Sequence, residues 1–98
     1  MSNDGPRIPI TISASSNAGS YNVQVKGRSV TQHCVAVASG YLRELGLDSH
    51  APSRVLQEAF EFLLERESNT SILTNFDLRD IERYFPEFRR EIARRLQG

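Results

Sequence analysis

The chain has 98 residues, and twelve Lys and Arg residues balance twelve Asp and Glu residues, so its formal net charge is zero. This length suits a single domain with one core, and the balanced charge excludes a molecule that attracts nucleic acid or an anionic membrane as a whole. One cysteine, Cys34, excludes an internal disulfide and is typical of a reducing compartment. We therefore expect a cytoplasmic protein.

Neither export nor membrane insertion is expected. The N-terminal residues lack the basic start and the apolar run of a secretory signal. The longest uninterrupted apolar run, CVAVA, is far too short to cross a bilayer. Residues 1–7 are small, polar or turn-forming and are expected to form a disordered tail, whereas residues 8–98 are expected to form a single small α+β domain.

Three strands are predicted in the first part of the domain. Apolar and polar residues alternate over residues 8–14 and over residues 21–26, which is the period of a strand with one buried face. Residues 28–37 predict a third strand, and the Lys26-Gly27 pair predicts a tight turn before it, with the glycine at positive φ. The simplest arrangement of these strands is a three-stranded antiparallel meander.

Helices are predicted to cover one face of this sheet. A short helix fits residues 39–46 and would end at Gly46, which tolerates the left-handed conformation. Over residues 53–67 the apolar side chains form a wide stripe at helical spacing, which predicts a longer amphipathic helix.

A third and a fourth helix are predicted on either side of a proline. Asn75 is expected to cap a helix that runs to Phe85. Pro86 lacks an amide hydrogen and biases Phe85 away from the helical region, so we expect the chain to break there and to restart as a fourth helix. Phe88 and Ile92 begin the apolar line of that helix. The predicted fold class is therefore α+β, a three-stranded antiparallel meander followed by three or four helices packed on one face.

The stretch RYFPEFRR, residues 83–90, is open to two interpretations. Its rings and arginines could form a nucleic-acid surface, or the rings could pack in the corner between two helices while the arginines face solvent. Phe85 and Phe88 fall on the apolar lines of their segments, and acidic residues are interleaved with the arginines, which favours a packed corner. Only the last ten residues carry a basic surplus, and a polyanion-binding tail is the other interpretation.

No residue pattern indicates a site of chemistry. His33 and Cys34 are neighbours in a predicted strand, so their side chains are expected on opposite faces and not as a nucleophile-base pair. His50 lies in a turn-rich segment, where a solvent-exposed or capping role is the simpler interpretation. Metal-ligand spacings and glycine-rich phosphate loops are absent from the sequence. We predict a protein that is not an enzyme and has no catalytic, cofactor-binding or metal-binding residue.

Residues 31–67 resemble the ribbon-helix-helix family of bacterial repressors: a strand, a short helix ending in LGLD, a turn, and then SRVLQEAFEFLLERE, which looks like that family's second helix. In that family the strands of two subunits pair and are inserted into the major groove of DNA. The resemblance implies a dimeric DNA-binding repressor or antitoxin whose strand residues face the groove. The candidate nucleic-acid contacts are then Arg28, Ser29, Thr31, Gln32 and His33.

A second resemblance covers more of the chain. A β-hairpin followed by FLLERE at residues 62–67 and IERYFPE at residues 81–87 is similar to a group of short bacterial proteins, mostly uncharacterised, in which FLLERE and IxRYFPE recur together. This resemblance implies a compact fold of a hairpin and helices without a catalytic site. It implies no particular activity.

The preferred prediction is a protein-interaction module or accessory subunit. Aromatic side chains widen the apolar faces of the predicted helices beyond what one small sheet can cover, and such side chains dominate the energetics of interfaces. We therefore expect a protein partner or a second copy of the chain, and the candidate contacts are Phe62, Tyr84 and Phe88. DNA binding is the alternative, and no membrane, metal or cofactor is expected.

Overall fold

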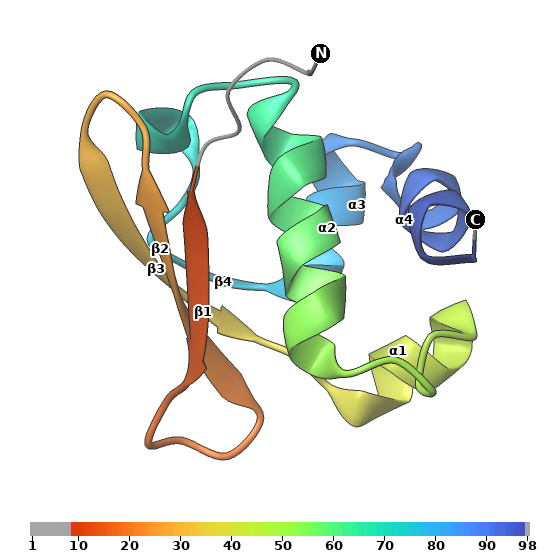
Figure 1. Ribbon diagram of the computed structural model, residues 1–98. Coiled ribbons are helices and arrows are strands. Elements are labelled where there is room, and N and C mark those ends of the chain that lie inside the picture. The colour runs from red at the N-terminus through yellow and green to blue at the C-terminus, as the bar shows by residue number, and fades with distance from the viewer. Residues whose placement is uncertain (1–8, 98) are drawn as a thin grey trace, which may run out of the picture.

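A four-stranded sheet forms one layer of the structure, and the helices form a second layer on one face of it (Figure 1). The structure is a computed structural model that describes residues 9–97. The tail expected over residues 1–7 lies outside the described residues. The predicted α+β class is confirmed, but the sheet is mixed and not purely antiparallel.

Three strands form the predicted antiparallel meander: β1 (Ile10–Ala14), β2 (Ser20–Lys26) and β3 (Val30–Ala36). One row of side chains on each strand faces the helices, because successive side chains alternate between the two faces of a sheet. Val23 on β2 lies opposite His33 on β3 in this row, and the two residues are 1% and 3% exposed. The meander therefore supplies one wall of the core.

The sequence pattern does not reveal the fourth strand, β4 (Asn75–Asp77), which pairs in parallel with β3 and forms one edge of the sheet. The register aligns Asn75 with Cys34 and Phe76 with Val35. The expectation that Asn75 caps a helix is therefore wrong. Three residues are too few to show a strand period, and this segment is extended because β3 offers it hydrogen-bonding partners.

Two helices follow the meander as predicted. Helix α1 (Ser39–Leu45) ends at Gly46, whose φ of 75° lies in the left-handed region. Helix α2 (Pro52–Leu64) lies across the inner face of the sheet (Figure 1). Its apolar stripe faces the sheet, and Leu56 and Phe60 have no exposed area.

The last part of the chain returns to the helical layer after β4. Two aspartates form a capping box around a 3₁₀ turn (Leu78–Asp80), which leads into the short helix α3 (Ile81–Tyr84). The backbone leaves the helical region at Phe85, where φ is −132° and ψ is 89°, as expected for a residue before a proline. Helix α4 (Phe88–Gln97) then begins, so the break predicted at Pro86 is confirmed.

The turn between β2 and β3 requires glycine for a reason that differs from the predicted one. Among the described glycines, positive φ occurs at Gly19 and Gly46 and not at Gly27. A Cβ on Gly27 would instead lie 2.7 Å from Oδ1 of Asn69, a residue that is only 6% exposed. The close approach of this buried side chain, and not the backbone conformation, excludes a larger residue.

We expect Gly27→Ala to lower the free energy of unfolding by about 1 kcal/mol or more, because Asn69 or the turn must shift to admit the methyl group. Gly40→Ala is the matched control. A Cβ on Gly40 meets no atom within 4 Å, and the residue lies inside α1, so alanine should raise the free energy of unfolding by about 0.5–1 kcal/mol. Chemical denaturation measures both changes, and effects of the same sign would contradict the steric account.

Candidate functional site

The aromatic residues around Pro86 comprise buried rings and one exposed ring. Phe62 and Phe88 have no exposed area, and their ring centroids are 5.2 Å apart. Phe85 is half-buried and packs edge-on against Phe62 at 5.8 Å. Tyr84 is 66% exposed. RYFPEFRR therefore forms a packed corner from which one ring projects.

This burial corrects two of the three candidate protein contacts. Phe62 and Phe88 lie in the interior because α2 and α4 pack against each other and enclose both rings. A partner would have to separate the helices to reach either residue. Tyr84 is the candidate contact that a partner can reach in the folded protein.

Two arginines close the solvent side of Phe62. The guanidinium carbon of Arg66 lies 3.7 Å from the centroid of the Phe62 ring, and that of Arg95 lies 5.7 Å from it. Arg95 donates to both carboxylate oxygens of Glu65, at 2.7 and 2.8 Å, and its side chain is only 14% exposed. Arg95 therefore covers the solvent side of the aromatic core.

A second charged cluster joins α1 to α3 and α4. The Tyr41 hydroxyl donates to Glu82 at 2.6 Å. Arg89 donates to the same carboxylate at 3.2 Å and to Glu44 at 2.8 Å. The hydrogen bond from Tyr41 lowers the pKa of Glu82, while burial and, next, the bond to Glu82 raise the pKa of Tyr41. The cluster holds the helices together and occupies the guanidinium group of Arg89.

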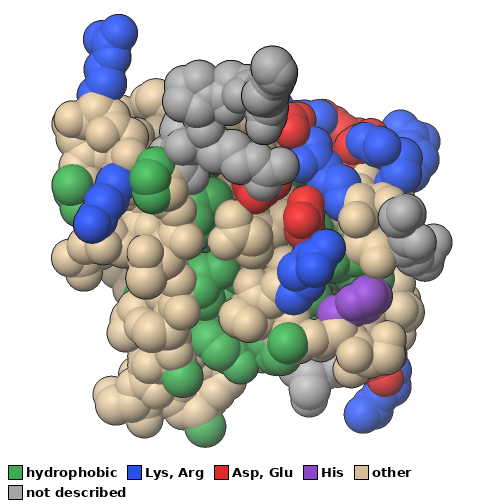
Figure 2. All heavy atoms as spheres, viewed as in Figure 1, with side chains coloured by type: hydrophobic (Ala, Val, Ile, Leu, Met, Phe, Trp, Pro, Cys, Tyr) green, Lys and Arg blue, Asp and Glu red, His purple; other side chains and the backbone are tan. Residues whose placement is uncertain are grey.

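Six of the ten arginines within residues 9–97 make ion pairs, which leaves four for a polyanion. Arg94, next to Arg95, is paired with Glu91 at 2.6 Å. In the part of the chain that the structure describes, the arginines without an ion pair lie on the β2–β3 loop, α1, α3 and α4; they are Arg28, Arg43, Arg83 and Arg90. On the face drawn in Figure 2, basic side chains at the upper right are interleaved with acidic ones. The corner around Pro86 therefore does not combine exposed rings with a row of unpaired arginines.

The candidate nucleic-acid contacts do not form one exposed row either. Arg28, Ser29 and Gln32 are exposed, whereas Thr31 is half-buried and His33 is 3% exposed. In addition, β3 is hydrogen-bonded to β2 on one side and to β4 on the other. The pairing with β4 covers only Cys34, Val35 and Ala36, and β2 occupies the whole of the other side, so a twin strand could pair with β3 only along residues 30–33.

His33 holds the segment after α2 against β3. Its Nδ1 lies 2.6 Å from the carbonyl oxygen of Leu73, and because a carbonyl only accepts, Nδ1 must carry the proton. Its Nε2 lies 3.0 Å from Oγ1 of Thr31, which also accepts a hydrogen bond from Nδ2 of Asn69 at 2.8 Å. When Nε2 of a neutral imidazole accepts from the Thr31 hydroxyl, each donor and acceptor in this chain of hydrogen bonds has a partner. We call the chain from Leu73 through His33 and Thr31 to Asn69 the His33 relay. The relay fixes the position of Leu73.

The side chains of His33, Cys34 and His50, which were considered as candidate reactive groups, do not share one site. His33 faces the helices and the half-buried Cys34 faces the other side of the sheet, as strand alternation predicts. His50 is half-buried in the turn between α1 and α2. Within residues 9–97, no three His, Cys, Asp or Glu side chains are grouped so as to hold a metal ion. None of the described helices has the length and apolar character needed to cross a membrane.

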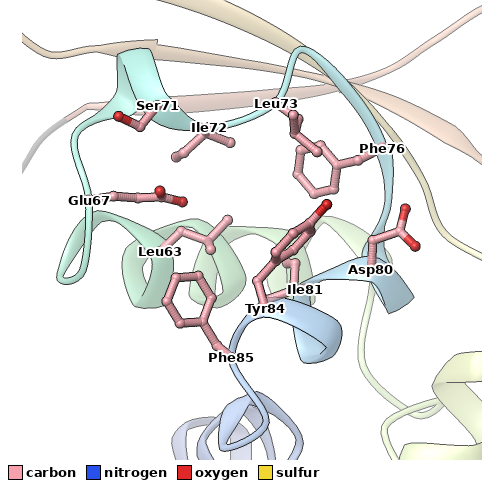
Figure 3. Close-up of a pocket in the computed structure, with 10 residues that line it drawn as sticks. All are labelled: Leu63, Glu67, Ser71, Ile72, Leu73, Phe76, Asp80, Ile81, Tyr84 and Phe85. Carbon is pink, nitrogen blue, oxygen red and sulfur yellow. The ribbon is translucent and has the colours of Figure 1, made fainter.

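An apolar groove lies between α3 and the segment that connects α2 to β4 (Figure 3). Its volume is about 260 Å³. Side chains from α2, from the connecting segment, from β4 and from α3 form its apolar floor; they are Leu63, Ile72, Phe76, Ile81 and Phe85. In Figure 3 the side chain of Tyr84 points across the groove toward Leu73 and Phe76.

Leu73 and Tyr84 form the exposed rim of this groove. They are 52% and 66% exposed, and the third large apolar residue that is exposed in the described chain, Val30, is 57% exposed. Val30 begins β3 and does not line the groove. Two of the three exposed large hydrophobic side chains are therefore gathered at one concave site, which is the arrangement expected of a binding surface.

The polar part of the groove is acidic. Glu67 and Asp80 line it, and no Lys or Arg does. Asp80 accepts a hydrogen bond from the backbone N–H of Asp77 at 3.1 Å. Neither lining carboxylate makes an ion pair with another described residue. The groove thus combines an apolar floor with two carboxylates at its margin that make no ion pair with another described residue.

The sequence made Tyr84 a candidate contact, and Tyr84 lines the groove, but no pattern indicated Leu73 or the groove itself. The signal in the sequence is the apolar pair Ile72-Leu73 inside an otherwise polar turn segment. The fold uses only one of the two for its core, since Ile72 is 6% exposed and Leu73 is 52% exposed. The carbonyl of Leu73 is bound by His33, 40 positions earlier, a contact that no local pattern indicates.

Comparison with protein-family models, with curated proteins and with solved structures found no match to this chain. No role is carried over from a relative, and both resemblances stay predictions.

Proposed function

We propose that this chain is a protein-interaction module and that the groove rimmed by Leu73 and Tyr84 docks an apolar side chain of a partner protein. The observation that carries this proposal is the gathering of two exposed large hydrophobic residues around a concave apolar floor. Exposed apolar surface of this kind is stabilised when another chain removes it from water.

The composition of the groove supports a protein ligand. Its floor is built from aliphatic and aromatic side chains, and its volume of about 260 Å³ gives room for a large side chain. An exposed tyrosine at the rim provides a rigid contact with a polar tip, which is a common feature of protein-protein hot spots. The absence of basic lining residues disfavours phosphates and nucleic acid at this site.

We expect Leu73→Ser and Tyr84→Ser each to weaken partner binding by about tenfold or more, because each removes a large contact from the rim. Val30→Ser is the matched control, since Val30 is 57% exposed but does not line the groove. The measurement is affinity capture of the tagged full chain and its variants from the native host, quantified by mass spectrometry.

A protein that is lost with both rim variants and retained with Val30→Ser is the expected partner. All three variants should keep the wild-type free energy of unfolding within about 0.5 kcal/mol, because the replaced side chains are largely exposed. If the three variants retain the same proteins in the same amounts as the wild type, the groove is not a docking site.

A further inference from the structure

The free edge of β4 borders the groove. β4 is the last strand in the sheet order, so only one of its sides is paired, with β3. Leu73 and Phe76, which line the groove, lie two positions before and one position after Asn75 in the sequence. An edge strand presents unpaired N–H and C=O groups to any extended segment that approaches it. Backbone hydrogen-bonding groups and an apolar cavity are therefore next to each other.

The orientation of these backbone groups follows from the pairing with β3. The N–H of Cys34 donates to the carbonyl oxygen of Thr74 at 2.7 Å, so the carbonyl group of Thr74 points at β3. Main-chain groups alternate in direction along a strand. Asn75 must therefore direct its N–H and C=O away from β3, toward the free edge. The N–H of Asp77 also belongs to this edge but is already held by Asp80.

The groove lies where an added strand would place a side chain. Phe76 faces the helices and packs against the Phe60 ring at a centroid distance of 6.1 Å. A strand paired with the free edge of β4 would have an inward side chain beside Phe76, over the apolar floor. Side chains at alternate positions of the added strand would point to the other face of the sheet.

The negative charge of the groove and of the adjoining edge favours some binding segments over others. The carboxylates of Glu67 and Asp80 line the groove, and Asp77 lies exposed at the same edge. Two copies of this chain joined edge to edge would bring these carboxylates together, which is unfavourable. A partner segment with Lys or Arg two positions from its apolar residue would instead complement them, because alternate side chains of a strand share one face.

We infer that the partner binds as an extended basic segment that adds a fifth strand to the edge of β4 and inserts an apolar side chain into the groove. This inference rests on the proposed function, and it adds the backbone conformation of the ligand and its charge. Main-chain hydrogen bonds would supply affinity, and the inserted side chain and the flanking basic residues would supply specificity.

The probe is a synthetic seven-residue peptide, Thr-Lys-Thr-Leu-Thr-Lys-Thr, capped at both ends and titrated into the ¹⁵N-labelled full chain; its two lysines share the strand face of the central leucine. We expect the largest amide shift changes at Asn75 and at the rim of the groove, with slower hydrogen exchange of the Asn75 amide in the complex. The same peptide with glutamate in place of lysine should bind at least about tenfold more weakly. Shift changes spread over all acidic surfaces would overturn the inference.

Two N-methylated versions of the peptide test strand pairing directly. One carries methyl groups on the amides of the odd-numbered positions and the other on those of the even-numbered positions. Only alternate residues of an added strand face β4, so one pattern should weaken binding by about tenfold through the loss of hydrogen bonds. The other pattern should leave the affinity within about a factor of two, because its methyl groups point away from the edge.

The protein offers a matched pair of charge variants. Glu67→Lys should weaken binding of the lysine peptide severalfold, whereas Asp48→Lys changes the net charge equally at an exposed residue outside the groove and should have a smaller effect. If both N-methylated peptides bind as the parent does and the groove amides still shift, strand addition is wrong but groove docking stands. If the groove amides do not shift with any of the peptides, the inference is wrong, and the capture experiment with the rim variants judges the proposed function separately.

Discussion

Phe62→Ala is expected to lower the free energy of unfolding by about 3–5 kcal/mol, the range for removing a fully buried aromatic ring. Phe62 has no exposed area and contacts the rings of both Phe85 and Phe88. The substitution also removes the surface on which the guanidinium groups of Arg66 and Arg95 rest. Urea or thermal denaturation of the variant measures the loss.

Tyr84→Ala is the control for Phe62→Ala, because Tyr84 is 66% exposed and lies in the same helical corner. Its effect on the free energy of unfolding should stay within about 0.5 kcal/mol. The two residues were equivalent candidates for partner contacts on the sequence alone. Similar losses of stability in the two variants would contradict the division of this corner into a buried core and an exposed rim.

His33→Ala is expected to lower the free energy of unfolding by about 2–4 kcal/mol, because it leaves a buried carbonyl unsatisfied and creates a cavity. The carbonyl is that of Leu73, and the cavity would adjoin Phe60, whose ring centroid is 5.4 Å from that of His33. Gln32→Ala, at the neighbouring exposed position of β3, should cost less than about 1 kcal/mol.

The His33 variant should also change the groove locally. Without the hydrogen bond to its carbonyl, the Leu73 segment loses an anchor to β3. Amides of residues 71–74 should then exchange with solvent faster than the drop in global stability explains. Hydrogen exchange of residues 71–74 could instead accelerate only as much as the loss of global stability predicts. In that case His33 does not position the rim of the groove.

Local patterns in the sequence were sufficient for elements with a clear period or a strong end signal. The stripe of α2, the left-handed Gly46 and the break before Pro86 are all determined by a few neighbouring residues, and each is present in the structure. The alternation of β1, β2 and β3 is of the same kind. These features need no knowledge of distant contacts.

The features that sequence reasoning missed depend on contacts between distant parts of the chain. β4 forms because β3 provides hydrogen-bonding partners for it. Gly27 is required because Asn69, 42 positions later in the sequence, occupies the space beside it. Phe62 was a candidate contact because it widens the apolar face of its helix, and no local pattern shows that Arg66, Arg95 and the ring of Phe88 cover it. The groove combines residues of four segments, so no single stretch of sequence contains its pattern.

Photo-crosslinking in the native host tests the role of the groove most directly. A photoreactive benzoylphenylalanine placed at Tyr84 should form an adduct with one partner protein, and the adduct should disappear when Leu73→Ser is added. The same group placed at Val30, which is also exposed but lies outside the groove, should not yield that adduct. Equal adducts from both positions, or no adduct from position 84, would contradict the assignment of this groove as the partner-binding surface.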